Sequence, residues 1–380
     1  MTSDALQNAE REISMTPRPH QKYTCPVLFP CGASLPEDRQ WYRERETHLP
    51  KHVGTEVFDR KAPCFSASAE IYVYPNMTNA DVLEEVIEKC DPVWKASVRR
   101  SFRKEGLVKR GEKGYRKCKT GHYVISGQNS SIYVARMLKN GWQTPVNLVL
   151  SGSIRQRSAL ARKISSQMLL DSLSVIDALG DSALLSKYGF NRENVFGLIM
   201  PDTYKVYWTD SMNVILDKQK AAWDAFWTEE NLTKAKIQGL TPMEVSTLAS
   251  IVRGESNYVP EYPMIAAVYL NRLHKGMKLQ ADPTVAFCYD YTLNRILKAH
   301  LKVDSPYNTY KHVGLPPAPI CSPGKDAMNA VLNPAGSKDI LYFCASPDFN
   351  GRHLFAATYS EHLRNARAFQ RALTARLRNR

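Results

Sequence analysis

Glu255 is the residue of this sequence whose position best fits acid–base chemistry. The segment Thr241–Glu244 (TPME) predicts a helix start, because it offers an N-cap threonine, a first-turn proline and a glutamate three residues after the cap. Apolar residues follow at spacings of three and four, and Glu255 falls on their face. Partial desolvation there raises the pKa of a carboxyl group, which is what a general acid for glycoside cleavage requires. The alternative is that the helix ends at Gly254 and Glu255 points into water.

Three loops downstream of this helix, residues 279–285, 307–310 and 314–320, combine polar and flat side chains. Their Asn, Gln, Asp, Thr and Tyr residues are donors, acceptors and ring faces of the kind that hold sugars. Each loop alone is more typical of a turn with local hydrogen bonds. Because they occur together and after Glu255, we expect them to form a cleft.

Short strands and helices that position these residues are predicted from about residue 70 onward. Three β-rich runs, at 71–74, 122–125 and 146–150, each precede a helical pattern, and a helix is expected from about Ser211 to Trp227. Residues 196–207 predict a turn with flanking strands. The fold class is therefore α+β, with an irregular extension over residues 1–67, a small α/β module over 68–150 and a larger mixed α/β domain over 151–380.

The formal net charge of +14 is concentrated in one segment of the 380-residue chain. Residues 95–163 contain 17 Lys and Arg residues but only two acidic residues. Such a patch fits an anionic partner, and it fits a solvated helix face equally well. No zinc-finger pattern or recognition-helix signature accompanies it, so DNA binding through this segment rests on charge alone and we expect no nucleic-acid partner.

Metal, nucleotide and membrane-spanning patterns are missing from the sequence. The eight cysteines include no C-x-x-C, and Cys118 with His122 offers only two ligands of a possible metal site. There is no glycine-rich phosphate loop and no G-x-S-x-G elbow. No apolar run approaches the roughly 18–20 residues of a membrane span. We predict neither a metal nor a cofactor.

Eight short motifs, taken in order, resemble those of the endolytic murein transglycosylases of the YceG-like family over about residues 70–370. Each is weak alone, and their order makes the resemblance specific. The motifs are Met200–Tyr204, Leu248–Val252 leading to Glu255, Asn271–Leu273, Leu279–Val285, Tyr307–Tyr310, Gly314–Pro317, Leu341–Ala345 and Gly351–Phe355.

The resemblance implies a LysM-like module ahead of a catalytic domain that cleaves peptidoglycan glycan strands between N-acetylmuramic acid and N-acetylglucosamine. Glu255 falls on the family's catalytic glutamate. In such an enzyme one carboxyl group serves first as acid and then as base, the product has a 1,6-anhydro end, and neither a second carboxylate nor a metal is needed. The residues predicted to contact substrate are Gln280, Asp282, Thr284, Asn308 and Tyr310.

The resemblance also implies a place in the cell envelope and cell-wall synthesis proteins as further partners. The family normally has an N-terminal transmembrane helix, whereas residues 1–67 contain no such segment. Arg253 stands where the family has an acidic residue or Gln, and Ala318 where it commonly has Gly. A cation touching Glu255 would lower its pKa, but helical positions two apart do not face each other. These departures leave a non-catalytic peptidoglycan-binding protein as the alternative function.

Overall fold

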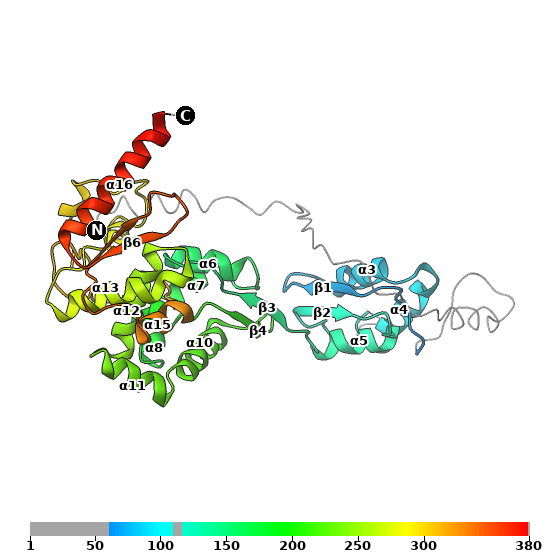
Figure 1. Cartoon of the computed structure of the whole chain (residues 1–380). Helices are drawn as coiled ribbons and strands as arrows, with labels where there is room; N and C mark the ends of the chain where they lie inside the picture. Colours follow the sequence, from blue (N-terminus) through cyan, green and yellow to red (C-terminus); the bar gives the residue numbers. More distant parts are fainter. Residues whose placement is uncertain (1–60, 109–115, 379–380) are drawn as a thin grey trace. The chain divides into compact units, whose positions relative to one another are not determined.

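The computed structural model describes residues 61–108 and 116–378, and Figure 1 labels their helices and strands. Most of the extension predicted over residues 1–67 lies outside the described residues, as does the middle of the basic segment. The described chain contains six strands in three two-stranded sheets, together with many helices, so the coarse α+β prediction is confirmed. None of the described helices is both long and apolar enough to cross a membrane.

Residues 64–138 form a small module with a hydrophobic core of its own. Strand β1 (Ala69–Val73) pairs antiparallel with β2 (Gly121–Ile125), and Ala69 lies opposite Ile125. The remaining elements are α3 (Asn79–Lys89), η1 (Pro92–Trp94), α4 (Lys95–Lys104) and α5 (Ser131–Asn140). Along the chain, α3 and α4 come between the two strands that pair, and α5 follows β2.

Capping residues set the limits of the helices in this module. The Thr78 side chain accepts a hydrogen bond from the Asp81 N–H and the Asp81 carboxylate accepts one from the Thr78 N–H, which is a capping box. At α5 the Ser130 hydroxyl accepts a hydrogen bond from the Tyr133 N–H and caps the helix without a reciprocal bond. Gly141 ends α5 at a φ of 74°, a left-handed conformation that glycine adopts without steric strain because it has no side chain.

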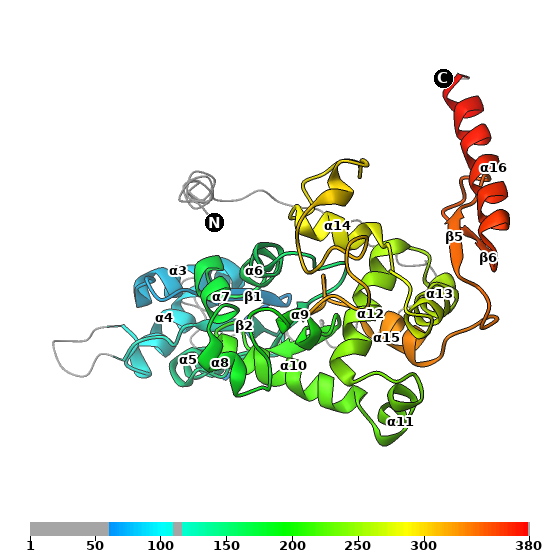
Figure 2. The same cartoon turned by 90° about the vertical axis from the view of Figure 1, so that its left-hand side faces the viewer.

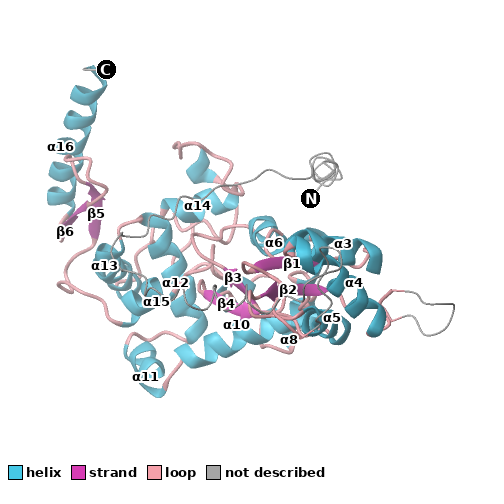
Figure 3. Cartoon of the chain, turned by 90° about the vertical axis from the view of Figure 1, so that its right-hand side faces the viewer, coloured by secondary structure: helices cyan, strands magenta, loops and turns pink. Residues whose placement is uncertain are grey.

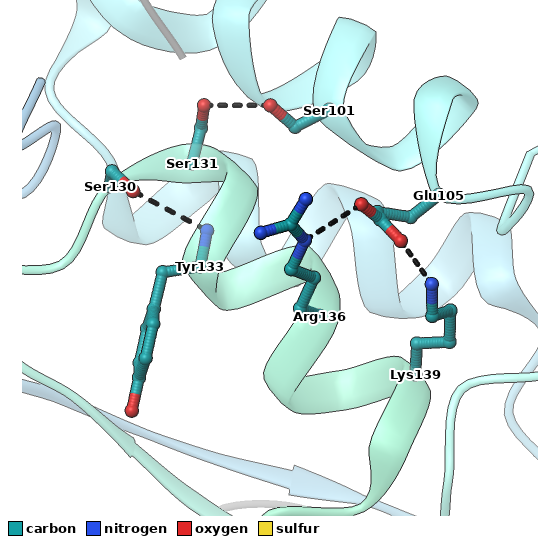
Figure 4. A network of polar contacts seen from close by, with 7 residues as sticks. All are labelled: Ser101, Glu105, Ser130, Ser131, Tyr133, Arg136 and Lys139. Carbon is teal, nitrogen blue, oxygen red and sulfur yellow. Dashed lines mark hydrogen bonds and ion pairs between the residues drawn. The ribbon is translucent and has the colours of Figure 1, made fainter. Parts of the chain in front are cut away.

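Glu105 joins the end of α4 to α5 (Figure 4). Its carboxylate accepts a hydrogen bond of 2.9 Å from Arg136 and a further bond from Lys139. Burial raises the pKa of Glu105, but the bonds from Lys139 and Arg136 outweigh burial and lower it. Two cations of the basic segment therefore neutralise a buried carboxylate of the same module.

The second and larger core begins at Leu148 and continues to Leu332. Strand β3 (Val146–Val149) pairs antiparallel with β4 (Thr203–Val206), although the sequence analysis assigned β3 to the first module. The helices that follow β3 are α6 (Arg157–Ser165), α7 (Ser172–Ala178), α8 (Ser182–Ser186), α9 (Val195–Leu198), α10 (Met212–Phe226), α11 (Glu229–Ile237), α12 (Pro242–Glu255), α13 (Tyr262–His274), α14 (Asp282–Cys288) and α15 (Lys325–Leu332), with short turns η2 (Val259–Glu261) and η3 (His300–Lys302).

The predicted helix at 211–227 is confirmed as α10, whereas one predicted strand is wrong. The segment before the predicted turn is helix α9, whereas the strand on its other side, β4, begins at Thr203 within the predicted 200–204 turn. All four residues of α9 are buried, and a short apolar run does not distinguish a buried strand from a buried helix. The strand was therefore predicted wrongly because the fold buries the whole segment, which leaves no alternation of apolar and polar residues to identify a helix.

Three helices of the large core pack together and hold the site described below. Helices α12 and α13 both contact α15, and they also contact each other, as Figures 1 and 2 show. Helix α14 packs against α12. The C-terminal part is a hairpin of β5 (Tyr342–Ala345) and β6 (His353–Ala356) followed by α16 (Tyr359–Arg378), seen in Figure 3.

Candidate active site

Glu255 is the last residue of α12, whose start and length agree with the sequence prediction. Thr241 and Glu244 form a capping box at its N-terminus, with Pro242 in the first turn. The helix continues through Gly254 to Glu255, so the alternative in which it ends at Gly254 is wrong. The helix thus carries a carboxyl group at the end of a buried apolar face.

Gly254 allows α12 to approach α14 closely. A Cβ atom on Gly254 would lie 2.6 Å from Cβ and 2.9 Å from Cγ of Pro283, and the proline ring cannot rotate away. Pro283 is the second residue of α14, directly after Asp282. The absence of a side chain at Gly254 therefore brings the first turn of α14 next to Glu255.

The surroundings of Glu255 favour its protonated form. Its side chain is only partly exposed, and desolvation is the largest influence on its pKa, which rises to about 7 from an ordinary value of 4.5. The Tyr269 hydroxyl donates a hydrogen bond of 2.5 Å to Oε1 and lowers the pKa. The negative charge of Asp282 raises it, and the positive charge of Arg272 lowers it. A carboxyl group in this state gives up a proton near neutral pH.

Arg272 connects the site to two segments of the chain. Its side chain is 8% exposed, and it donates hydrogen bonds to the carbonyl oxygens of Leu279 at 2.6 Å and Leu341 at 2.7 Å. Its guanidinium also lies over the Tyr342 ring, 5.4 Å from the centroid. Tyr269 and Arg272 are three residues apart on α13 and share one face. Neither side chain is among the site residues predicted from the sequence.

Asp282 and Tyr310, both predicted to contact substrate, lie together beside Glu255. The Tyr310 hydroxyl donates a hydrogen bond of 2.6 Å to Oδ1 of Asp282. Asp282 is exposed at the first turn of α14 and Tyr310 is half-buried. Burial, followed by the bond to Asp282, raises the pKa of Tyr310, so the phenol keeps its proton at neutral pH.

The other three predicted contacts differ in their exposure. Gln280 is exposed and has a φ of 51°, and its N–H donates to the Thr309 carbonyl at 3.1 Å. Thr284 is fully buried, with its hydroxyl 2.8 Å from that of Thr309. Asn308 is also fully buried, and its amide donates to the carbonyls of Leu301 and Val303. In this conformation only Gln280 of the three has a surface that a ligand can touch.

Neither departure from the family pattern, Arg253 or Ala318, is exposed. The Arg253 guanidinium lies 3.5 Å from the Pro323 carbonyl oxygen, and Arg253 is not among the groups that shift the pKa of Glu255. Ala318 is buried. Within residues 61–108 and 116–378, no three His, Cys, Asp or Glu side chains are grouped to bind a metal ion.

The model of the YceG-like family matches residues 70–368 of the sequence. The chain belongs to this family. The resemblance inferred from the eight motifs is thereby confirmed. A crystal structure of a YceG-like protein from Listeria monocytogenes has a TM-score of 0.51 and 25% sequence identity, and the match covers 78% of this chain and 98% of that one.

Two YceG-like relatives carry the name endolytic murein transglycosylase. The protein from Bacillus subtilis (strain 168) is 34% identical over 166 residues, which is 44% of this chain and 45% of that protein. The protein from Streptococcus pneumoniae serotype 2 (strain D39) is 27% identical over 304 residues, which is 70% of this chain and 54% of that protein. The chain thus spans about half the length of these curated relatives.

Proposed function

We propose that this YceG-like chain is a lytic transglycosylase that cleaves peptidoglycan strands between N-acetylmuramic acid and N-acetylglucosamine, leaving 1,6-anhydro-N-acetylmuramic acid ends. The observation that carries the proposal is the Glu255 carboxyl group, with a pKa of about 7, at the meeting point of α12, α13 and α14. The names of the Bacillus and Streptococcus relatives support the same activity and substrate.

Glu255 acts first as a general acid. The protonated carboxyl group donates its proton to the glycosidic oxygen, and the bond from that oxygen to C1 of the muramic sugar breaks. Positive charge develops at C1 and the ring oxygen as the bond lengthens. The carboxylate of Asp282, which faces the same site, stabilises this charge, and Arg272 is held away by its two carbonyl partners.

Glu255 acts next as a general base. The carboxylate left by the first step takes the proton from the C6 hydroxyl of the muramic sugar, and the C6 oxygen attacks C1 to close the anhydro ring. The carboxyl group returns to its protonated form, so one side chain completes the cycle and water is not consumed. A pKa near neutrality suits both steps, because neither protonation state is then strongly disfavoured.

The residues predicted to bind substrate divide into two groups in this proposal. Gln280, Asp282 and Tyr310 contact the sugar or its acetamido groups, since each has an accessible surface beside the site. Thr284 and Asn308 instead hold the 279–285 and 307–310 loops together, because their polar atoms are bonded inside the protein. We also propose that residues 64–138 are a LysM-like wall-binding module, and that the protein works in the cell envelope with cell-wall synthesis proteins as partners.

The test is mass spectrometry of purified peptidoglycan after incubation with the wild type and with Glu255→Gln. The wild type is expected to release anhydro-ended fragments, and Glu255→Gln to release none. Ordinary reducing ends would show a hydrolase and refute the one-carboxyl mechanism. A non-catalytic binding protein would give a different result. It would sediment with insoluble peptidoglycan equally well with and without Glu255→Gln, and it would release no products at any pH.

A further inference from the structure

A hollow of about 240 Å³ is lined in part by Phe287 of α14, the helix that begins at Asp282 beside Glu255. Three arginines line it, Arg155, Arg157 and Arg192, together with the aromatic rings of Phe287 and Tyr291. The Arg155 guanidinium lies 5.2 Å from the centroid of the Tyr291 ring, so one face of the guanidinium is occupied and its edge remains available. The hollow therefore combines flat apolar walls with several guanidinium groups.

The three arginines of this hollow outnumber the two carboxylates that line it. Glu193 and Asp290 also line it, but among the described residues neither they nor any other carboxylate lies within ion-pair distance of the three arginines. Burial, and then the like charge of Arg192, lowers the pKa of Arg157, while Glu193 opposes this. An anion in the hollow would relieve this repulsion.

Most N–H groups of the three arginines are also unused. Arg157 donates to the carbonyl of Arg192 at 3.2 Å and Arg155 donates to the Ser153 hydroxyl at 3.2 Å, and no other hydrogen bond from these guanidiniums is found in the described chain. A guanidinium has five N–H donors arranged to match the two oxygens of a carboxylate. The Gln156 side chain bonds to the Asp290 carbonyl at 2.6 Å instead of capping α6, so the uncapped start of α6 adds to the positive charge.

Helix α14 and the 307–310 loop each contribute residues to this hollow and to the surroundings of Glu255. Helix α14 has Asp282 at its start and Phe287 near its end, about 8 Å apart at 1.5 Å per residue. The 307–310 loop also reaches both places, since Tyr307 lines the hollow and Tyr310 bonds to Asp282. A branch of a ligand held at Glu255 would therefore run along α14 to reach the hollow.

We propose that Arg155, Arg157 and Arg192 form a subsite for a carboxylate of the peptide stems that peptidoglycan strands carry. The inference rests on the proposed function, because it takes the glycan strand to lie at Glu255. The stem branches from the muramic sugar, and its carboxylates are the anions nearest to the bond that is cleaved. The subsite makes the enzyme prefer strands that still carry peptides.

The first test compares two substrates, strands with intact peptides and the same strands after enzymatic removal of the peptides. Arg157→Gln and Arg192→Gln are expected to raise KM for peptide-bearing strands about 10- to 100-fold and to leave peptide-free strands unaffected. Arg157→Lys keeps the charge and should recover part of the loss. Arg367→Gln, an exposed arginine on α16, is the matched control. Equal losses on both substrates, or no loss on either, would overturn the subsite.

The second test measures binding without catalysis, so that it stands even if the proposed function fails. Calorimetry with full-length Glu255→Gln compares a disaccharide peptide that has free carboxylates with the same compound after amidation. Binding of the free form alone, lost when Arg157→Gln is added, supports the subsite. Equal binding of both forms, or binding that ignores Arg157→Gln, would overturn it. Tighter binding of inorganic phosphate than of the free peptide would assign the hollow to a phosphate ligand and refute the carboxylate assignment.

Discussion

The Tyr269 hydroxyl donates a hydrogen bond of 2.5 Å to Oε1 of Glu255, from a helix packed directly against α12. Since Oε1 already accepts this bond, the acidic proton of Glu255 belongs on Oε2. The bond also restricts rotation of the carboxyl group, so that Oε2 keeps one direction. In the proposed reaction, Tyr269 therefore decides which oxygen meets the glycosidic bond.

The rate of glycan cleavage should fall with rising pH above neutrality. The pKa of Glu255 is raised to about 7, and only the protonated form can act as the acid. We expect kcat/KM to fall about tenfold per pH unit above pH 7 and to change little between pH 5.5 and 6.5. Initial rates of release of anhydro fragments across pH 5–9 measure this. A descending limb near pH 5 would contradict the raised pKa.

Two substitutions should shift the pH at which kcat/KM begins to fall, and they should shift this descending limb in opposite directions. Tyr269→Phe removes a hydrogen bond that lowers the pKa of Glu255, so its limb should move to higher pH. Asp282→Asn removes a negative charge that raises this pKa, so its limb should move to lower pH. The same pH–rate series measures both. Tyr188→Phe, which removes a tyrosine bond to Asp217 elsewhere, is the control and should leave the limb unchanged; parallel shifts in the two variants would refute the assignment.

Gly254→Ala should reduce both stability and activity. Helix propensity alone favours alanine by about 1 kcal/mol. The new Cβ, however, would lie 2.6 Å from Pro283, and overpacking of this kind costs about 1–3 kcal/mol. Urea unfolding and kcat report the two effects, with Gly180→Ala as a control because its Cβ would meet atoms only at 3.5 Å. A Gly254→Ala variant that is more stable and fully active would show that α14 need not lie so close.

Asn308→Ala should destabilise the protein by about 2–3 kcal/mol. The substitution leaves the partly buried carbonyls of Leu301 and Val303 without their donor and removes the acceptor for the Tyr310 N–H. The measurement is urea unfolding combined with kcat and KM, and exposed Asn333→Ala is the control. A large rise in KM at unchanged stability would instead assign Asn308 a direct contact with substrate.

The sequence was most informative where local chemistry decides structure. Thr241 and Glu244 cap α12 as their spacing predicts, and the apolar periodicity placed Glu255 on the buried face. Tyr269 was not found, because a tyrosine in an apolar helix has the pattern of a core residue. Its hydroxyl became significant only through a partner on another helix, 14 residues away.

Polar loop residues were harder to interpret because their partners are distant in sequence. Thr284 bonds to Thr309, 25 residues away, and this contact distinguishes a buried support from a surface contact. Gln280 has the same polar character and is exposed. Amino-acid type therefore located the loops, and tertiary hydrogen bonds decided which side chains a ligand can reach.

Arg272 binds the carbonyls of Leu279 and Leu341 with one guanidinium; Leu279 begins the 279–285 loop and Leu341 directly precedes strand β5. If that guanidinium leaves its site, both segments lose a charge-assisted hydrogen bond in the same event. Amide protons of the 279–285 loop and of β5 should therefore exchange with solvent as one cooperative unit. Loosening of the C-terminal hairpin is then transmitted to the residues beside Glu255 without any direct contact with substrate.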